Sequence, residues 1–275
     1  MRRLIRYGFH LALYPRKWKH ADFIESTEKL GCNFCQVFAG NPRGWSLRAN
    51  KEKLHELGKR AKEKGIGVLV HTGYLVNLAS SLPGGIEKSI RRIDEEIEAA
   101  HLLGSDYIVV HMGKPKNLGK EEGIRLMIEA LKLISKDKRK FILLENTAGA
   151  GSELGASVYE LKSVLSEVEV GGICFDTAHA YAAGIDVADV SKLKEYADFF
   201  RKYVKVIHLN DTARPFKSHV DRHALLKNGY IGSKLEDFVK FCLDLSVRNF
   251  VVELPSDDFE EYVRNAQILK EWLGV

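Results

Sequence analysis

The sequence predicts a single α/β domain in which eight parallel strands close into a (β/α)8, or TIM, barrel. Three observations predict this fold. The chain holds eight short apolar segments, each is followed by a segment of helical period, and 275 residues lie within the range of one such barrel. One catalytic domain is therefore expected to span residues 1–275. No G-x-G-x-x-G turn follows the first apolar segment, which argues against an open, dinucleotide-binding sheet.

The predicted elements alternate regularly along the chain. Strands are expected where short apolar runs suit burial on both faces of a parallel sheet, at 8–13, 35–38, 67–71, 107–111, 141–145, 172–176, 204–208 and 249–253. Helices are expected where apolar residues recur with helical period, at 21–30, 51–65, 89–104, 123–136, 157–168, 189–203, 234–245 and 259–273. The longest irregular piece, 210–232, follows the seventh strand, and long loops in this place usually carry function.

Composition narrows the class of protein. The net charge of +5 and pI of about 8.8 are compatible with a polyanionic partner. No apolar run approaches membrane-spanning length and the start lacks a signal-peptide pattern, so a cytoplasmic protein with no membrane partner is expected. Four cysteines are too few for a disulfide scaffold, and the Cys32/Cys35 pair at the start of a strand is expected to pack rather than react.

The ends of the predicted strands carry the strongest functional pattern. The third to eighth strands end, in order, in His71, His111, Glu145, Asp176, His208 and Glu253. Asp and Glu together number 37 and His 10 in the whole chain, so chance is a poor explanation for six consecutive ends of this type. Barrel active sites form where the strands end. The six side chains are therefore expected to meet at the barrel mouth.

Three more residues are expected at the same mouth. His179 follows Asp176 by three residues, and Asp221 and His223 lie two apart in the long loop, where an extended backbone turns both to one side. Five imidazoles and four carboxylates suit zinc, with manganese or iron as substitutes. Three Zn2+ ions per chain would use nine ligands if one carboxylate bridges. Without metal, such an array would leave costly unpaired charges.

Several segments resemble the endonuclease IV family of apurinic/apyrimidinic (AP) endonucleases. They are HTGYLVNLAS from His71, LLENTAGAGSELG from Leu143, FDTAHAYAAGID from Phe175, IHLNDT from Ile207, DRHALLKNGYIG from Asp221 and VELP from Val252. The resemblance implies zinc-dependent hydrolysis of the phosphodiester 5′ to abasic sites in double-stranded DNA during base excision repair. The products would be a 3′-hydroxyl and a 5′-deoxyribose phosphate, and the resemblance leaves a 3′-end repair activity open.

The resemblance also implies a role for each site residue. His71 and His111 would bind the first zinc, Glu145 would bridge the first and second and orient the nucleophile, and the remaining ligands would complete the second ion (Asp176, His208, Glu253) and the third (His179, Asp221, His223). Arg43, Tyr74 and Leu75 match residues that penetrate the duplex at the lesion. The chain departs from the family pattern at Met112, Ala178 and Leu254, and in its first loop, 10–20.

Two alternatives remain open at this point. A single-metal sugar isomerase or epimerase on the same barrel class would use Glu145, Asp176, His208 and Glu253, but it would leave the other five residues without a common task. A nucleic-acid-binding barrel without activity would not need intact ligands. A metal count of three, one or none per chain separates these readings, and a monomer is expected for an enzyme that binds DNA on one face.

Overall fold

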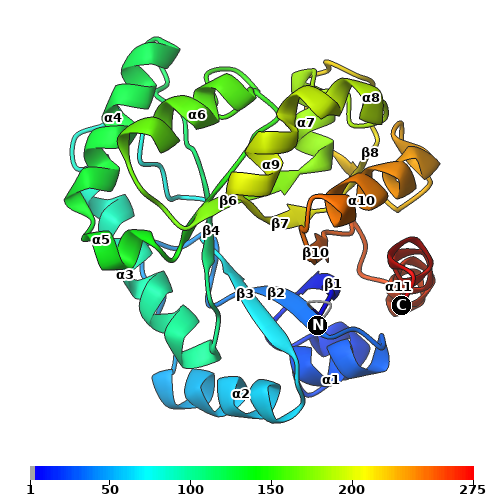
Figure 1. The fold of residues 1–275 in the computed structure, drawn as a ribbon. Helices are drawn as coiled ribbons and strands as arrows, with labels where there is room; N and C mark the ends of the chain where they lie inside the picture. Colours follow the sequence, from blue (N-terminus) through cyan, green and yellow to red (C-terminus); the bar gives the residue numbers. More distant parts are fainter. Residues whose placement is uncertain (1–3) are drawn as a thin grey trace.

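Eight parallel strands close into a barrel in the computed structural model, which describes residues 4–275 (Figure 1). Around the barrel they follow the order β1-β2-β3-β4-β5-β6-β7-β10 and then return to β1. Their bounds are β1 (Arg6–Leu11), β2 (Phe34–Phe38), β3 (Gly67–His71), β4 (Ile108–His111), β5 (Ile142–Glu145), β6 (Gly172–Asp176), β7 (Val204–His208) and β10 (Asn249–Val252). The predicted fold class is confirmed, and each expected strand is found.

The helices form a ring outside the strands (Figure 1). They are α1 (Phe23–Lys29), α2 (Lys51–Glu63), α3 (Gly85–Leu103), α4 (Lys120–Leu133), α5 (Lys136–Arg139), α6 (Val158–Glu167), α7 (Thr177–Ala183), α8 (Val190–Leu193), α9 (Ala197–Tyr203), α10 (Leu235–Asp244) and α11 (Phe259–Leu273). Short 3-10 turns lie at Arg16–Trp18, Lys194–Tyr196 and Gly232–Lys234. The N-termini of several helices are capped by a side chain that accepts a hydrogen bond from a backbone N–H. These capping residues include Asp22, Asn50, Ser157 and Asp258.

The structure differs from the sequence-based assignments in several places; for example, α3 begins at Gly85 rather than at 89, and α4 spans Lys120–Leu133 rather than 123–136. The first strand lies at Arg6–Leu11 rather than 8–13. The helix expected at 189–203 is two helices, because α8 packs on α10 while α9 packs on β7, and one straight helix cannot serve both surfaces. The irregular piece 210–232 contains a small antiparallel pair, β8 (Asp211–Thr212) with β9 (His223–Ala224).

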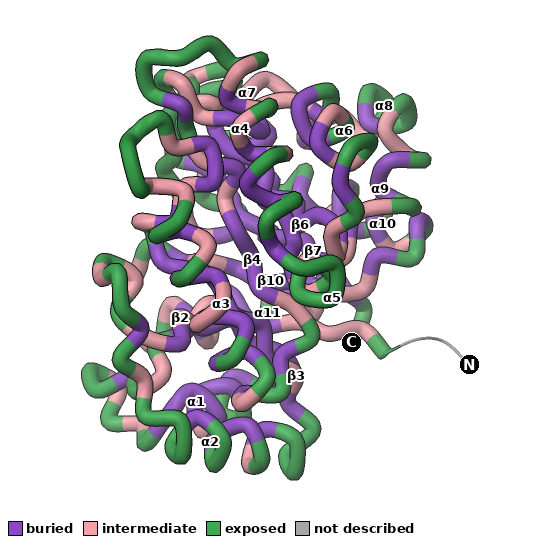
Figure 2. Tube along the Cα trace, turned by 90° about the vertical axis from the view of Figure 1, so that its left-hand side faces the viewer, coloured by how far each residue is buried: buried purple, intermediate pink, exposed green. Residues whose placement is uncertain are grey.

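The barrel interior is built in layers. Side chains on a strand alternate between its two faces, so every second residue points inward. One buried apolar cluster fills the inner layer, with one residue from each of seven strands: Phe34, Leu69, Val109, Leu143, Cys174, Val206 and Val251. Figure 2 shows these central strands as buried tubes under exposed loops and helix faces. Two residues further along, the next layer toward the strand ends consists of Gln36, His71, His111, Glu145, Asp176, His208 and Glu253.

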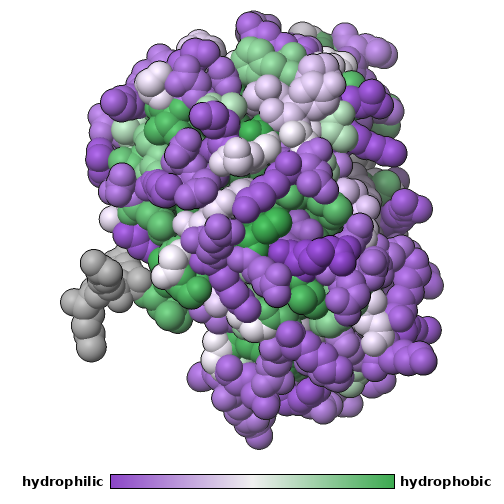
Figure 3. All heavy atoms as spheres, turned by 90° about the vertical axis from the view of Figure 1, so that its right-hand side faces the viewer, coloured by the Kyte–Doolittle hydropathy of each residue, from purple (hydrophilic) through white to green (hydrophobic). Residues whose placement is uncertain are grey.

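The molecular surface is mostly polar and the cysteines are buried. Hydrophilic side chains cover most of the face in Figure 3, with hydrophobic ones in small scattered groups. Within residues 4–275, none of the helices combines the length and the apolar character that a membrane crossing requires. All four cysteines are buried and free, and burial raises the pKa of the Cys32 and Cys35 thiols to about 12, as expected of thiols that only pack.

Candidate metal centre

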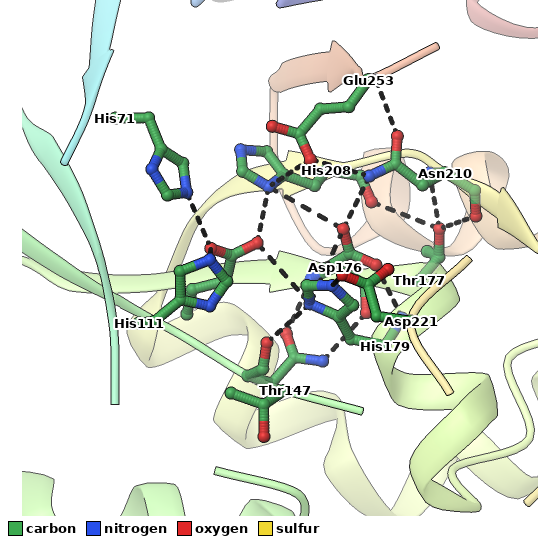
Figure 4. Close-up of polar contacts among 12 residues, drawn as sticks. His71, His111, Thr147, Asp176, Thr177, His179, His208, Asn210, Asp221 and Glu253 are labelled. Atoms are coloured by element: carbon green, nitrogen blue, oxygen red, sulfur yellow. Dashed lines mark hydrogen bonds and ion pairs between the residues drawn. The ribbon is translucent and has the colours of Figure 1, made fainter. Parts of the chain in front are cut away.

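The polar residues at the strand ends meet at the mouth of the barrel. His71, His111, Glu145, Asp176 and His208 are the last residues of β3 to β7, and Glu253 directly follows β10. The strand register aligns neighbours, since His111 pairs with Glu145 and Asp176 with His208. Figure 4 shows His71, His111, Asp176, His208 and Glu253 pointing toward one another from different strands. The parallel sheet therefore assembles in space a set that is spread over 183 positions of the chain, from His71 to Glu253.

Glu145 lies at the centre of this set. Its side chain is 1% exposed, and four imidazoles surround its two oxygens. Oε2 lies 3.0 Å from Nε2 of His71 and 3.4 Å from Nε2 of His111. Oε1 lies 2.8 Å from Nδ1 of His208 and 3.7 Å from Nδ1 of His179. The two oxygens thus face different partners, which is the arrangement that a bridging carboxylate requires.

Four of the imidazoles have one ring nitrogen already engaged by an oxygen. Nδ1 of three rings lies near a backbone carbonyl, in His71 (Thr72, 2.8 Å), His179 (Asn146, 2.9 Å) and His223 (Glu253, 3.2 Å). In His208 it is Nε2, 2.8 Å from Oε1 of Gln36. A carbonyl oxygen only accepts, so each of these nitrogens carries the proton. In the neutral ring the other nitrogen has a lone pair available for a metal ion on the side of the carboxylates, as in metal-binding histidines.

A short helix that the sequence analysis did not predict positions His179. Helix α7 starts directly after β6, and Oδ1 of Asp176 caps it by accepting a hydrogen bond of 2.7 Å from the His179 amide. The first helical turn brings the His179 ring back over the mouth, where its Nδ1 lies 3.7 Å from Glu145 and 3.9 Å from Asp176. Asp176 therefore faces the cluster with one oxygen and fixes the helix with the other.

The β8–β9 hairpin supplies the two residues from the long loop. His223 begins β9 and Asp221 precedes it. The two side chains meet as expected from their spacing, with Nε2 of His223 3.3 Å from Oδ1 of Asp221. The second oxygen of Asp221 lies 3.4 Å from Nε2 of His179. Asp221 is the most exposed of the nine residues, at 55% of its side chain, and forms the solvent side of this part of the centre.

The donors fall into three groups that could each hold a cation. Their ligand atoms lie within 4.8 Å of one another in the groups His71/His111/Glu145, Glu145/Asp176/His208/Glu253 and Asp176/His179/His223. Glu145 and Asp176 each belong to two groups. Nε2 of His223 is buried without a hydrogen-bond partner in the described part of the chain. An orphaned imidazole nitrogen beside buried carboxylates fits a missing metal ion.

Burial and mutual charge shift the pKa values of the metal-free centre in opposite directions. Burial alone would raise the pKa of Glu145, but the imidazoles, His111 and His208 first among them, hold it well below its usual range. Burial raises the pKa of Asp176, which His179 offsets only in part. Burial lowers the pKa of His111 to about 4. His111 is therefore neutral at pH 7, the form in which imidazole binds a metal.

Sequence reasoning missed the amides that hold the ligands. Buried Gln36 donates from Nε2 to Oε1 of Glu253 at 2.7 Å, and its own Oε1 contacts His208. Asn210 donates to Oδ2 of Asp176 at 2.6 Å and to Oε2 of Glu253 at 3.2 Å. Gln36 occupies the ligand layer of β2, so the same two-residue period would have found it. No comparable signal marked Asn210, whose position follows from the turn after β7.

A cavity of about 700 Å3 opens above the clusters. Its lining includes His10, whose Nδ1 lies 3.0 Å from Oε1 of Glu253. Tyr74 stands at its rim, 59% exposed, with its ring 5.3 Å from that of Phe38. Arg43 is also exposed on the neighbouring loop, while Leu75 is half-buried and lines an adjoining groove of about 680 Å3. Tyr74 therefore lies at the mouth and Leu75 in the adjoining groove, while Arg43 lies on the loop bonded to the Tyr74 amide.

The comparisons with known proteins agree with this geometry. Residues 24–272 match the family model described as xylose isomerase-like TIM barrel. Endonuclease 4 from Thermus thermophilus is 37% identical over 278 residues, covering 98% of each chain, and probable endonuclease 4 from Halothermothrix orenii is 33% identical, covering 91% of this chain and 94% of that protein.

Solved structures give the same result. The crystal structure of an endonuclease IV from Thermus thermophilus superposes with a TM-score of 0.80 at 34% identity, over 98% of this chain and 99% of that one. A D-tagatose 3-epimerase-like protein superposes with a TM-score of 0.76, but at 20% identity this likeness shows the fold alone. Because the endonuclease 4 from Thermus thermophilus is 37% identical and the solved endonuclease IV 34% identical over nearly the full length, the chain belongs to the endonuclease IV family.

Proposed function

We propose that this protein is a zinc-dependent AP endonuclease that hydrolyses the phosphodiester on the 5′ side of abasic sites in double-stranded DNA. The observation that carries the proposal is that two features lie together at the mouth of the barrel. Three donor groups able to hold cations lie at the floor of the cavity, Tyr74 stands at its rim, and exposed Arg43 lies on the loop whose Pro42 carbonyl accepts the Tyr74 amide. Phosphodiester chemistry needs the first feature and recognition of a DNA lesion needs the second.

The nine ligands fit three zinc ions. His71 and His111 would hold the first, Glu145 would bridge to a second held also by Asp176, His208 and Glu253, and the third would lie between His179, Asp221 and His223. Zinc bound in these places would lower the pKa of an attacking water and stabilise negative charge on the phosphate and the leaving oxygen. Manganese or iron could occupy the same imidazole and carboxylate donors.

The protein's own side chains orient the reaction. Glu145, the proposed catalytic carboxylate, lies between His71 and His208, whose ring nitrogens are 3.0 and 2.8 Å from its two oxygens, so its oxygens would stay directed at the proposed ions. Tyr74 and Leu75 would enter the base stack, and Arg43 would contact a phosphate, leaving the abasic nucleotide extruded into the cavity. The adjoining groove carries Lys88, Lys114 and Lys116 on its wall, charges suited to the flanking phosphates.

A hydrolytic cut is favoured over a lyase cut by the residues around the cavity. A lyase needs an amine nucleophile to form an imine with the abasic sugar. Among the described residues that line the cavity above the clusters there is no lysine. Attack on the phosphate 5′ to the lesion expels the 3′ oxygen of the preceding nucleotide. The products are then a 3′-hydroxyl and a 5′-deoxyribose phosphate; the same phosphate chemistry at 3′ ends would give an end-repair activity.

The decisive experiment is incision of a duplex with one abasic site, with and without a chelator, followed by borohydride treatment. We expect cleavage that the chelator abolishes and zinc restores, with 3′-hydroxyl ends and no trapped protein–DNA adduct. A borohydride-trapped adduct with unsaturated aldehyde at the 3′ end would refute the hydrolytic mechanism. Full activity in the metal-depleted protein would refute the assigned centre.

Elemental analysis separates this proposal from a single-metal sugar isomerase. The isomerase would use only the group Glu145/Asp176/His208/Glu253, which is present here as one of three. It would leave the orphaned Nε2 of His223 without a metal ion to bind. We expect close to three zinc ions per chain, whereas a value of one would favour the isomerase.

Three further properties belong to the proposal. The chain would act as one catalytic domain and as a monomer, because the mouth is open on a single face for the duplex. Light scattering during gel filtration tests the monomer. A cytoplasmic setting agrees with the four buried free thiols, which a reducing compartment preserves.

A further inference from the structure

Two loops carry the residues proposed to probe the DNA, and they are joined to each other. We call residues 39–50, with Arg43, and residues 72–76, with Tyr74 and Leu75, the probing loops. The amide of Tyr74 donates a hydrogen bond of 2.8 Å to the carbonyl of Pro42. The backbones approach so closely that a Cβ on Gly73 would lie 2.8 Å from the same carbonyl oxygen. A movement of one loop must therefore carry the other with it.

A buried ion pair on helix α3 holds the first of these loops. Arg92 and Glu96 are both 1% exposed, and Nε and Nη2 of Arg92 lie 2.9 and 2.7 Å from Oε1 of Glu96. The same guanidinium donates from Nη1 to the carbonyl of Gly44 at 3.3 Å and from Nη2 to that of Asn41 at 3.4 Å. These two carbonyls lie on either side of the Pro42–Arg43 segment. One planar fork thus fixes the backbone from which Arg43 projects.

The neighbouring residues of α3 strengthen the attachment. Glu95 accepts a hydrogen bond of 2.8 Å from the amide of Leu47, further along the same loop. Oε2 of Glu96 is buried without a hydrogen-bond partner among the described residues; burial raises the pKa of this carboxyl, and Arg92, followed by the Gly73 amide of the second probing loop, lowers it in part. The carboxylate therefore faces the second probing loop while it binds the arginine that holds the first.

The cost of this pair indicates a purpose other than stability. Burying two charges costs several kcal/mol per ion, and apolar replacements of similar volume are often equally stable. Helix α3 already buries Ile93, Ile97 and Ala100 against the barrel. What apolar side chains cannot supply is a directed set of donors to loop carbonyls. Resting on the function proposed above, we infer that Arg92 and Glu96 are positioning residues that set the probing loops for an abasic duplex.

Two variants and one control test this inference. The double substitution Arg92→Met with Glu96→Met removes both charges together, so that neither remains buried alone. Arg92→Lys keeps the charge beside Glu96 but loses the fork that reaches two carbonyls, and it serves if the double variant does not fold. The matched control is Asp94→Asn. Asp94 lies on α3 but away from the probing loops, and the substitution breaks its 2.7 Å ion pair with Lys138.

Three measurements are made on each protein with its metals bound. The first is kcat and KM on a duplex with one abasic site. The second is hydrolysis of bis(p-nitrophenyl) phosphate, a small diester that needs the metal centre but no probing loop. The third is the rate of trypsin cleavage after Arg43 and Arg48, both of which lie in the first loop.

For the double variant we expect KM on the duplex to rise about tenfold while kcat stays within about twofold of the parent value. The reason is that part of the binding free energy is then used to order the loops. Small-diester hydrolysis stays at the parent rate, and trypsin cuts the loop about tenfold faster. Arg92→Lys falls between, and Asp94→Asn matches the parent. Unchanged KM and trypsin rates, or an equal loss on both substrates, would overturn the inference. A parent that does not cut abasic DNA refutes the proposed function instead, and the trypsin rates still decide whether the pair orders the loop.

Discussion

Replacement of Gln36 by methionine should loosen metal binding without touching a ligand. Methionine has the same chain length as glutamine, and the site is fully buried, so the change removes polar contacts and little volume. Three contacts are lost: to His208 at 2.8 Å, to Glu253 at 2.7 Å and to His10 at 2.8 Å. The ring of His208 and the carboxylate of Glu253 are then free to rotate away from the proposed second ion.

The expected size of the effect follows from what such contacts are worth. Loss of a group that orients a metal ligand lowers metal affinity or activity about 10–100-fold. This corresponds to about 1.4–2.7 kcal/mol of binding free energy. The buried N–H of His208 also loses the acceptor that Gln36 provides, which costs the metal-free fold about 1–3 kcal/mol. The variant should therefore release zinc more readily and unfold at a lower temperature once the metal is removed.

Competition with a chromogenic chelator measures the zinc affinity, and incision of abasic duplex measures the activity. The matched control is Val37→Ala, next on the same strand and buried on the opposite face. It lowers stability by leaving a small cavity but should keep the zinc affinity of the parent. If Gln36→Met binds zinc as tightly as the parent, or if Val37→Ala loses as much affinity, the argument that Gln36 orients the ligands is wrong.

Three further predictions concern the ligands, the loops and the thiols. Glu145→Ala and Asp221→Ala should each lower incision by more than about a hundredfold, the upper range for an orienting group alone, with zinc content by elemental analysis falling in parallel; parent-like activity in a metal-depleted variant would contradict this. Arg43→Ala and Tyr74→Ala should keep the zinc but raise KM for abasic duplex about tenfold, and unchanged kinetics in both would remove the wedge hypothesis. Burial raises the thiol pKa of Cys35 from 9.0 to about 12, so its contribution to stability is complete below pH 9 and is lost as pH rises toward 12; thermal unfolding between pH 8 and 11 checks this, and a melting temperature that rises over this range would contradict it.

The sequence was sufficient to predict the fold and which strand-end side chains meet at the mouth because two local rules govern both. Continuous apolar runs identify buried parallel strands, and the last residue of each run identifies the mouth. His71 and Glu145 could be predicted to meet although 74 positions separate them. Gln36 was accessible to the same rule, but an amide inside a strand lacks the chemical signature of an acid or an imidazole and was passed over.

Other features could not be predicted because they depend on tertiary contacts. Helix α7 is a single short stretch whose start is fixed by Asp176, and its alanine-rich sequence has no amphipathic period to reveal it. The break between α8 and α9 reflects which neighbour each helix packs on. Arg92 and Glu96 stand four apart on a charged helix, a spacing typical of exposed ion pairs, and only the packed structure shows them buried.

The layered interior also bears on how the protein acquires its metals. Each of the first two proposed ions would draw ligands from separate strands, so the unfolded chain offers no pair of those ligands close enough in sequence to hold a cation. Only the third has a local pair, Asp221 with His223. A cation that binds the closed barrel and not the open chain stabilises closure by mass action. Zinc-loaded protein should then unfold at a higher temperature than metal-free protein. Zinc uptake during refolding would show when β10, the last strand of the barrel, pairs with β1.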